Sequence, residues 1–195
     1  VVGTNAAKVA LGMGADVTVL ERSITRMRQL DDMFGGNVKT IFANSGNTAD
    51  QLITADLLIG AVLVPGATAP MLVTRSQLSS MKPGAAIVDV AIDQGGCFET
   101  SKATTHENPI YNVDGIIHYC VANMPGAVAR TSTIALGNAT MPFILSLANK
   151  GWRKACKENE HLLNGLNVHL GNITYKAVGE ALDLKFISPE SALSI

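Results

Sequence analysis

Apolar and polar positions alternate along the chain with two periods, one typical of helices and the other of strands. Apolar residues recur at helical spacing after Ser23, which can cap a helix that ends at Gly35. Further helices are predicted at 3–11, at 48–53 and from Thr74. Short β-branched or apolar runs predict strands at 16–20, 38–42 and 57–62, up to Asp89, and at 116–121. This alternation is typical of an α/β fold with a doubly wound parallel sheet.

The pattern changes after residue 129. Residues 132–149 are predicted to form one long helical region broken near Pro142, and the remainder to form short helices without strands. Within the first part, a loop runs through Pro65 and Gly66. We therefore expect two units, a doubly wound one over residues 1–129 and a helical one over residues 130–195.

We expect the chain to begin inside a motif, because the residues from Val1 onward already have the pattern of a helix. In a doubly wound sheet of strand order 3-2-1-4-5-6, the strand before the first helix is central. We therefore expect a preceding segment, and we expect the strands at 16–20 and 57–60 to flank an unfilled position without pairing with each other. The helices after Arg130 should likewise expose an apolar face that this segment would cover, around Ile134, Met141 and Leu145.

Composition excludes several classes of function. Of the 195 residues, 47% are apolar and 16% are charged, which is typical of a globular protein with a sizeable core. A net charge of -1 and an aromatic content of 5% argue against a nucleic-acid partner. The longest apolar stretch near the middle, 57–64, is far shorter than the ~20 residues that span a membrane, so no membrane partner is expected.

The cysteines and histidines predict neither disulfides nor a metal site. Cys97, Cys120 and Cys156 are widely spaced and odd in number, which argues against disulfides and for a reducing, cytoplasmic location. Cys97 lies beside a glycine pair and could be reactive, although an inert reduced thiol is the alternative. Metal-ligand spacing is missing around the histidines, so no metal site is predicted at His106, His118, His161 or His169.

Gly3 and Glu21 fit two positions of a dinucleotide-binding motif. In such folds the third glycine of G-x-G-x-x-G lets a helix pack closely on the sheet, and an acidic residue after the next strand binds the adenosine ribose. A carboxylate at Glu21 would repel a 2′-phosphate, which favours NAD over NADP. Arg26 could reach the same ribose or face water. The alternatives are a helix packed closely for structural reasons at Gly3 and a solvated turn residue at Glu21.

Two later strands also end in polar residues. A β-branched run through Ile87 and Val88 leads to Asp93, just before Gly95 and Gly96. The next strand leads to Asn123. Because ligands bind at the carboxyl ends of parallel strands, the two ends predict one crevice. Asp93 could instead cap the glycine pair, and Asn123 could pair with a nicotinamide carboxamide or be an ordinary turn residue.

Several runs of sequence closely resemble NAD-dependent alanine dehydrogenases. They include residues 60–67, residues 88–100 with Ile92-Asp93-Gln94-Gly95-Gly96-Cys97, and residues 121–128. The resemblance continues through 130–133, 148–152 and 165–167, so it covers nearly the whole chain. It implies a Rossmann domain that binds NAD over residues 1–129, lacking its first central strand, and a helical part of the substrate domain over residues 130–195.

The resemblance also implies a reaction and a set of site residues. The reaction is reversible oxidative deamination of L-alanine by NAD to pyruvate and ammonium, in a hexameric enzyme. Asp93 would act at the reacting end, as the catalytic residue and also beside the cofactor. The other implied cofactor-binding residues are Gly3, Glu21, Arg26, Val62, Leu63, Val121, Ala122, Asn123 and Met124.

The chain departs from the family's pattern at certain points. Glu21 stands where Asp is usual, and Ala43 stands where some members carry Ser near the adenine. The family's catalytic Lys and His lie in an N-terminal segment that this sequence lacks, so we expect the chain alone to be inactive. One alternative is the NAD-binding alpha subunit of a proton-translocating transhydrogenase, which shares the fold and part of these motifs. Another is a fragment without any activity.

Overall fold

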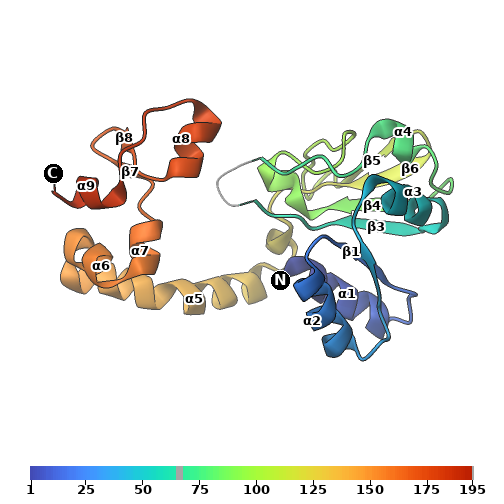
Figure 1. Cartoon of the computed structure of the whole chain (residues 1–195), viewed down its shortest axis with the longest axis horizontal. Helices are drawn as coiled ribbons and strands as arrows, with labels where there is room; N and C mark the ends of the chain where they lie inside the picture. Colours follow the sequence, from blue (N-terminus) through green and yellow to red (C-terminus); the bar gives the residue numbers. More distant parts are fainter. Residues whose placement is uncertain (65–67, 195) are drawn as a thin grey trace. The chain divides into compact units, whose positions relative to one another are not determined.

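The computed structural model describes residues 1–64 and 68–194, and the loop predicted at Pro65 and Gly66 lies outside them. The chain divides into two compact units (Figure 1). The first unit is built from Val1–Leu63 and Ala69–Ala122, and the second continues from Asn123.

The first unit contains two sheets of mainly parallel strands. β1 (Thr18–Glu21) pairs in parallel with β2 (Lys39–Phe42). The other sheet has the order β3-β4-β6-β5, and its strands are Leu57–Gly60, Ala86–Asp89, Ile116–Tyr119 and Ile110–Val113. β3, β4 and β6 are parallel, whereas β5 is antiparallel to β6. Parallel strands that alternate with helices confirm the predicted α/β fold.

β1 and β3 do not pair with each other among the described residues, as the sequence predicted. In a doubly wound sheet of order 3-2-1-4-5-6, β2 and β1 match the third and second strands, and β3, β4 and β6 match the fourth, fifth and sixth. The position of the first strand, between β1 and β3, is filled by no strand of residues 1–64 and 68–194. The strand predicted over 57–62 ends at Gly60, and Leu57 is exposed.

The first unit's helices begin and end where the local side chains favour it. α1 spans Val2–Gly12, and α2 (Ile24–Phe34) follows Ser23, whose hydroxyl accepts the N–H of Arg26. α2 ends at Gly35, whose φ of 56° is left-handed. α3 (Ser45–Thr54) starts three residues before the predicted position because the Asn44 side chain caps it. The helix predicted from Thr74 is α4 (Arg75–Leu78), and the Thr74 side chain caps it by accepting the N–H of Gln77.

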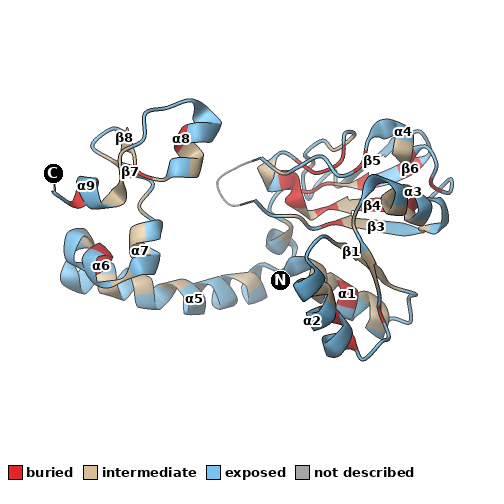
Figure 2. Cartoon of the chain, in the orientation of Figure 1, coloured by how far each residue is buried: buried red, intermediate tan, exposed pale blue. Residues whose placement is uncertain are grey.

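Two groups of buried side chains stabilise this unit. The smaller group joins α1 and α2 to the chain before β2 and consists of Ala7, Leu30, Phe34 and Val38. The larger group surrounds β4, with Ile87 fully buried at its centre. Figure 2 shows the buried residues concentrated on β4 and the segment that follows it. That segment is η1 (Val90–Gln94), a 3-10 helix.

β5 forms a hairpin with β6 and lies between the strand that ends at Asp89 and the strand predicted at 116–121, where the sequence predicted no strand. Its turn is formed by Asp114 and Gly115, whose φ values of 53° and 85° are both positive. A two-residue turn of this kind is favoured by Asp-Gly because its twist matches that of the paired strands. β6 itself is shorter than predicted and ends at Tyr119.

The second unit is mostly helical. It contains η2 (Met124–Val128) and α5 (Ala129–Lys150), followed by α6 (Trp152–Glu158), α7 (Glu160–Asn164), α8 (Lys176–Leu182) and α9 (Pro189–Ser194). The predicted break at Pro142 is wrong, because α5 continues through it. The residue that loses its bonding partner, Asn138, is exposed, so water can reach its carbonyl. The prediction of no strands is also wrong, since β7 (Val168–His169) and β8 (Asn172–Ile173) form a small hairpin.

α5 contains no buried residue (Figure 2). Its exposed apolar side chains include the three predicted ones, Ile134, Met141 and Leu145, each about half exposed. None of the helices in the described part of the chain is long and apolar enough to cross a membrane.

Candidate functional site

Three parallel strands of the first unit end at the same edge of their sheet. Gly60, the last residue of β3, lies opposite Asp89, the last residue of β4. β6 runs in the same direction beside β4. The segments that carry Val62, Asp93 and Val121 therefore leave the sheet at one edge, which is where ligands bind in doubly wound folds.

The segment after β3 contains Val62, which is half-buried and packs against the larger core, and Leu63, which is 71% exposed. Gly60 precedes them, and a Cβ added there would meet the Sγ of Cys97 and lie 2.7 Å from a ring carbon of Phe98. The chain that follows β4 therefore returns across the end of β3, and this contact requires a residue without a side chain.

Gly3 lies where α1 approaches the segment after β3. A Cβ added to Gly3 would lie 3.4 Å from the Cβ of Ala61, a tight but possible contact. The geometry agrees with the close packing that the third glycine of a dinucleotide motif provides.

Glu21 and Arg26 lie at the other sheet, where β1 leads into α2. One carboxylate oxygen of Glu21 accepts the N–H groups of Arg22 at 2.7 Å and Ser23 at 3.0 Å. The guanidinium of Arg26 donates to Thr4 Oγ1 at 2.8 Å, which ties α2 to the start of α1. This bond holds the half-buried Arg26 beside the first turn of α1. The two environments predicted for Arg26, the ribose and water, stay open.

Asp93 lies in η1 and is exposed. The next two residues, Gly95 and Gly96, have φ values of 92° and 83°, which other residues rarely adopt. Their N–H groups bond to the carbonyls of Ile92 and Ala91, which folds the chain back tightly after Asp93.

Asp89, four residues earlier, is the buried acid of this edge, and the sequence analysis did not single it out. Its side chain is 0% exposed. It accepts hydrogen bonds from the backbone of Ala91 and Cys97, from the Cys97 thiol and from the Ser101 hydroxyl. The signal in the sequence was an acidic residue inside an otherwise apolar strand, where burial requires hydrogen-bonding partners.

Cys97 is fully buried, and its pKa is raised above the usual value, first by burial and then by the Asp89 carboxylate. A thiol reacts as its thiolate, which this environment disfavours. The structure therefore favours the inert alternative for Cys97 over the reactive one.

Two side chains of the β5–β6 hairpin, Tyr111 and His118, bind the chain after β4 at Thr100 and Lys102. The His118 ring contacts the carbonyl of Ile116 at 2.9 Å and the hydroxyl of Thr100 at 2.7 Å. The hydroxyl of Tyr111 accepts the N–H of Lys102 at 2.7 Å and donates to the Thr100 carbonyl at 2.8 Å. The chain after β4 is thus fastened to both strands of the β5–β6 hairpin.

The four predicted residues after β6 follow one another along the chain. Val121 is fully buried and bridges to Thr104, and the N–H of Ala122 bonds to the Thr104 carbonyl. Asn123 has a φ of 55° and precedes η2, which starts at Met124. The first unit ends at Ala122, so the structure brings Val121 and Ala122 to the edge with Val62 and Asp93, whereas Asn123 and Met124 begin the second unit.

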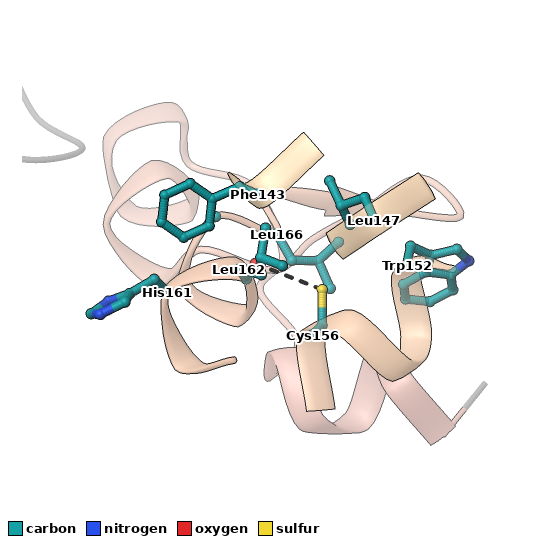
Figure 3. A pocket seen from close by; sticks show the side chains of 8 residues that line it. Phe143, Leu147, Trp152, Cys156, His161, Leu162 and Leu166 are labelled. Carbon is teal, nitrogen blue, oxygen red and sulfur yellow. Dashed lines mark hydrogen bonds between the residues drawn. The ribbon is translucent and has the colours of Figure 1, made fainter. Parts of the chain in front are cut away.

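The second unit contains a separate apolar cavity of about 310 Å³ (Figure 3). The thiol of Cys156 lies 3.7 Å from the Leu162 carbonyl inside it, and the side chains of Trp152 and Leu147 lie nearby. None of the residues predicted to bind a cofactor or substrate lines this cavity.

Comparison with known proteins assigns the chain to a family. Residues 1–176 match the family described as alanine dehydrogenase/PNT, C-terminal domain. The chain belongs to this family. The sequence is 60% identical over 193 residues to an alanine dehydrogenase of Halomonas elongata, covering 99% of this chain and 52% of the relative. It is 56% identical to alanine dehydrogenase 2 of Staphylococcus aureus, with the same coverage of both chains.

Solved structures of the family agree with the fold. An L-alanine dehydrogenase matches 93% of this chain and 50% of its own length, with a TM-score of 0.83 and 46% identity. A transhydrogenase from Sinorhizobium meliloti matches 90% of this chain and 47% of its own length, with a TM-score of 0.68 and 25% identity. The chain therefore spans about half the length of the alanine dehydrogenases that it matches.

Proposed function

We propose that the protein containing this chain is an NAD-dependent alanine dehydrogenase, which converts L-alanine reversibly to pyruvate and ammonium. The observation that carries this proposal is the 60% identity to an alanine dehydrogenase over 99% of the chain. The greater distance of the transhydrogenase, at 25% identity, favours the amino-acid enzyme over the transhydrogenase subunit.

The residues present fit NAD. Gly3 provides the close approach of α1 to the segment after β3, and Glu21 places a carboxylate at the end of β1. Arg26 lies beside the same turn, and Val62, Leu63 and the residues from Val121 to Met124 follow the strands that end at the candidate edge. When bound, NAD supplies the acceptor for hydride. Residues 1–129 would hold the cofactor, and residues 130–195 would belong to the substrate domain.

Asp93 is the catalytic candidate of this chain. Its exposure lets its carboxylate meet a substrate or a water molecule, and the fixed turn after it limits where that carboxylate can lie. We assign it the orientation of the substrate or catalytic water. The part of the relatives that this chain does not cover would supply the Lys and His of the family, close over the site and exclude water. Cytoplasmic location and a hexamer belong to the same proposal.

The activity is tested by following NADH at 340 nm with the complete gene product. Alanine with NAD should produce NADH, and pyruvate with ammonium should consume it. Each direction should require both components. A complete protein that instead passes hydride between NADH and an NADP analogue, and ignores ammonium, would support the transhydrogenase subunit and contradict the proposal.

Glu21 should set the preference for NAD over NADP. Replacing its carboxylate, as in Glu21→Ser, should raise the kcat/KM for NADP relative to NAD by roughly tenfold, because like charges about 4 Å apart repel by about 1 to 4 kcal/mol between water and a protein surface. Asp31→Asn, on the exposed part of α2, is the matched control and should leave the ratio unchanged. Equal use of both cofactors by the unmodified protein would remove Glu21 from the ribose site.

A further inference from the structure

The carboxylate of Asp89 is fully buried and saturated with hydrogen bonds. Its Oδ1 accepts from the Ala91 N–H at 2.9 Å and the Cys97 thiol at 3.3 Å. Its Oδ2 accepts from the Cys97 N–H at 2.7 Å and the Ser101 hydroxyl at 2.5 Å. An ionised carboxylate has about four lone-pair sites, so these partners occupy its bonding capacity.

Both ends of a short loop are fastened to this one carboxylate. The loop, residues 91–97, starts at the Ala91 N–H and closes at the Cys97 N–H. Asp93 lies between the two points of attachment. The chain passes close to Asp89 and Ser101 at Gly96, where only glycine fits, because a Cβ there would lie 2.9 Å from Asp89 Oδ2 and 2.7 Å from the Ser101 Cβ.

The bonds of Asp89 point to a role beyond stability. Its hydrogen-bond donors all belong to residues 91–101, and none of the ion pairs among the described residues involves Asp89. A buried charge without a cation is expensive, and an apolar side chain would be less costly to bury at this site. Only an acceptor with two oxygens, however, can hold both ends of the 91–97 loop together with Ser101.

We propose that Asp89 is a positioning residue, which fixes the 91–97 loop so that the Asp93 carboxylate lies at one place beside the reacting groups. This inference rests on the proposed function, since it requires Asp93 to act in the reaction. Asp89 itself stays buried and touches neither substrate nor cofactor.

The test is a double-mutant cycle in the complete protein. Asp93→Asn and Asp89→Asn should each lower kcat on the order of 10²-fold, because misplacing a reacting group by about 1 Å has an effect of that size. The KM for NAD should change little. In the Asp93→Asn background, Asp89→Asn should have almost no further effect on kcat, since Asp89 acts through Asp93. Asp56→Asn, an exposed aspartate before β3, is the matched control and should keep wild-type turnover.

A second readout separates loop order from overall folding. In Asp89→Asn, an alkylating reagent should label Cys97 faster, while Cys156, buried in the other unit, should react at the wild-type rate. If Asp89→Asn does not fold, Ser101→Ala removes a single donor. It should lower kcat by a smaller factor, and this loss should also vanish in the Asp93→Asn background.

The outcomes distinguish the two proposals. Wild-type turnover in Asp93→Asn would remove the catalytic role of Asp93, and the positioning role with it. A strong loss in Asp93→Asn with wild-type turnover in Asp89→Asn would overturn the positioning role alone. Losses that multiply in the double variant would also overturn it, because independent effects on kcat show that Asp89 does not act through Asp93.

Discussion

His118 illustrates how a single buried side chain can fasten a loop. The Ile116 carbonyl can only accept, so the ring donates from Nδ1, and Nε2 then accepts the Thr100 hydroxyl. The imidazole is fully buried and stacks on Tyr111 with ring centroids 4.8 Å apart. The neutral ring satisfies both of its partners, whereas the protonated ring would carry a buried charge.

The stability of the first unit should therefore fall with decreasing pH. Burial lowers the pKa of His118 below its ordinary value, while the Ile116 carbonyl and Asp114 oppose this shift. Because the unfolded chain binds a proton near pH 6.5 and the folded chain does not, unfolding is favoured as the pH drops below about 6.5 and towards the folded pKa.

Urea unfolding between pH 7.5 and 5 measures this effect. In His118→Gln the free energy of unfolding should depend less on pH over that range than in the wild type. His106→Gln is the control, since His106 is exposed. The same pH dependence in His118→Gln and the wild type would contradict the assignment to His118.

Asp89 and Asp93 show what sequence reasoning could reach at the residue scale. The pattern located the edge, because an acidic residue next to a glycine pair follows an apolar strand. It could not tell which acid is buried. That depends on Cys97 and Ser101 returning to Asp89, a contact between separated residues that no local periodicity encodes.

At the scale of elements, Gly60 lets the chain after β4 cross the end of β3. Gly60→Ala should lower the free energy of unfolding by about 1 to 3 kcal/mol, because the added methyl group overpacks the contact with Cys97 and Phe98. Gly12→Ala, at the end of α1, is the control, since a Cβ there meets nothing within 4 Å. Urea denaturation measures the free energy of unfolding of both variants. A Gly60→Ala variant as stable as the wild type would contradict the prediction, because it would show that the chain after β4 can move away from the end of β3 without loss of stability.

Elements with a local signal were predicted well. Ser23 and Gly35 predicted both ends of α2, and Thr74 predicted the start of α4. β5 was missed although Asp114-Gly115 is a strong hairpin signal, because few residues before it alternate in hydrophobicity. The break predicted near Pro142 was wrong, since an exposed helix tolerates the loss of one hydrogen bond when water replaces it.

At the scale of the whole molecule, β1 and β3, the two strands expected to flank the unfilled position, each have a neighbour on one side only among the described residues. β3 pairs with β4, and β1 pairs with β2. β4 and β6 each have neighbours on both sides. Successive amides of a strand point to opposite sides, so about half of the amides of β3 lack a partner strand.

Amide hydrogen exchange of the 195-residue chain should show this difference. The amides of β4 should exchange slowly throughout, whereas those of β1 and β3 should alternate between slow and fast. β6 is the internal control. A preceding segment that added the central strand would slow the fast amides in the complete protein. Uniform slow exchange in β1 and β3 of the chain alone would contradict the unfilled position.

α5 has 22 residues and buries none of them in the described chain, so its own backbone must supply most of its stability. Its composition is poor for that purpose, because it combines several threonines with Gly137 and Pro142. Such a helix frays when isolated and becomes ordered when another surface covers it. Circular dichroism at 222 nm would therefore report on assembly: the helical signal would rise with protein concentration or with the addition of a partner, before any enzymatic assay is possible.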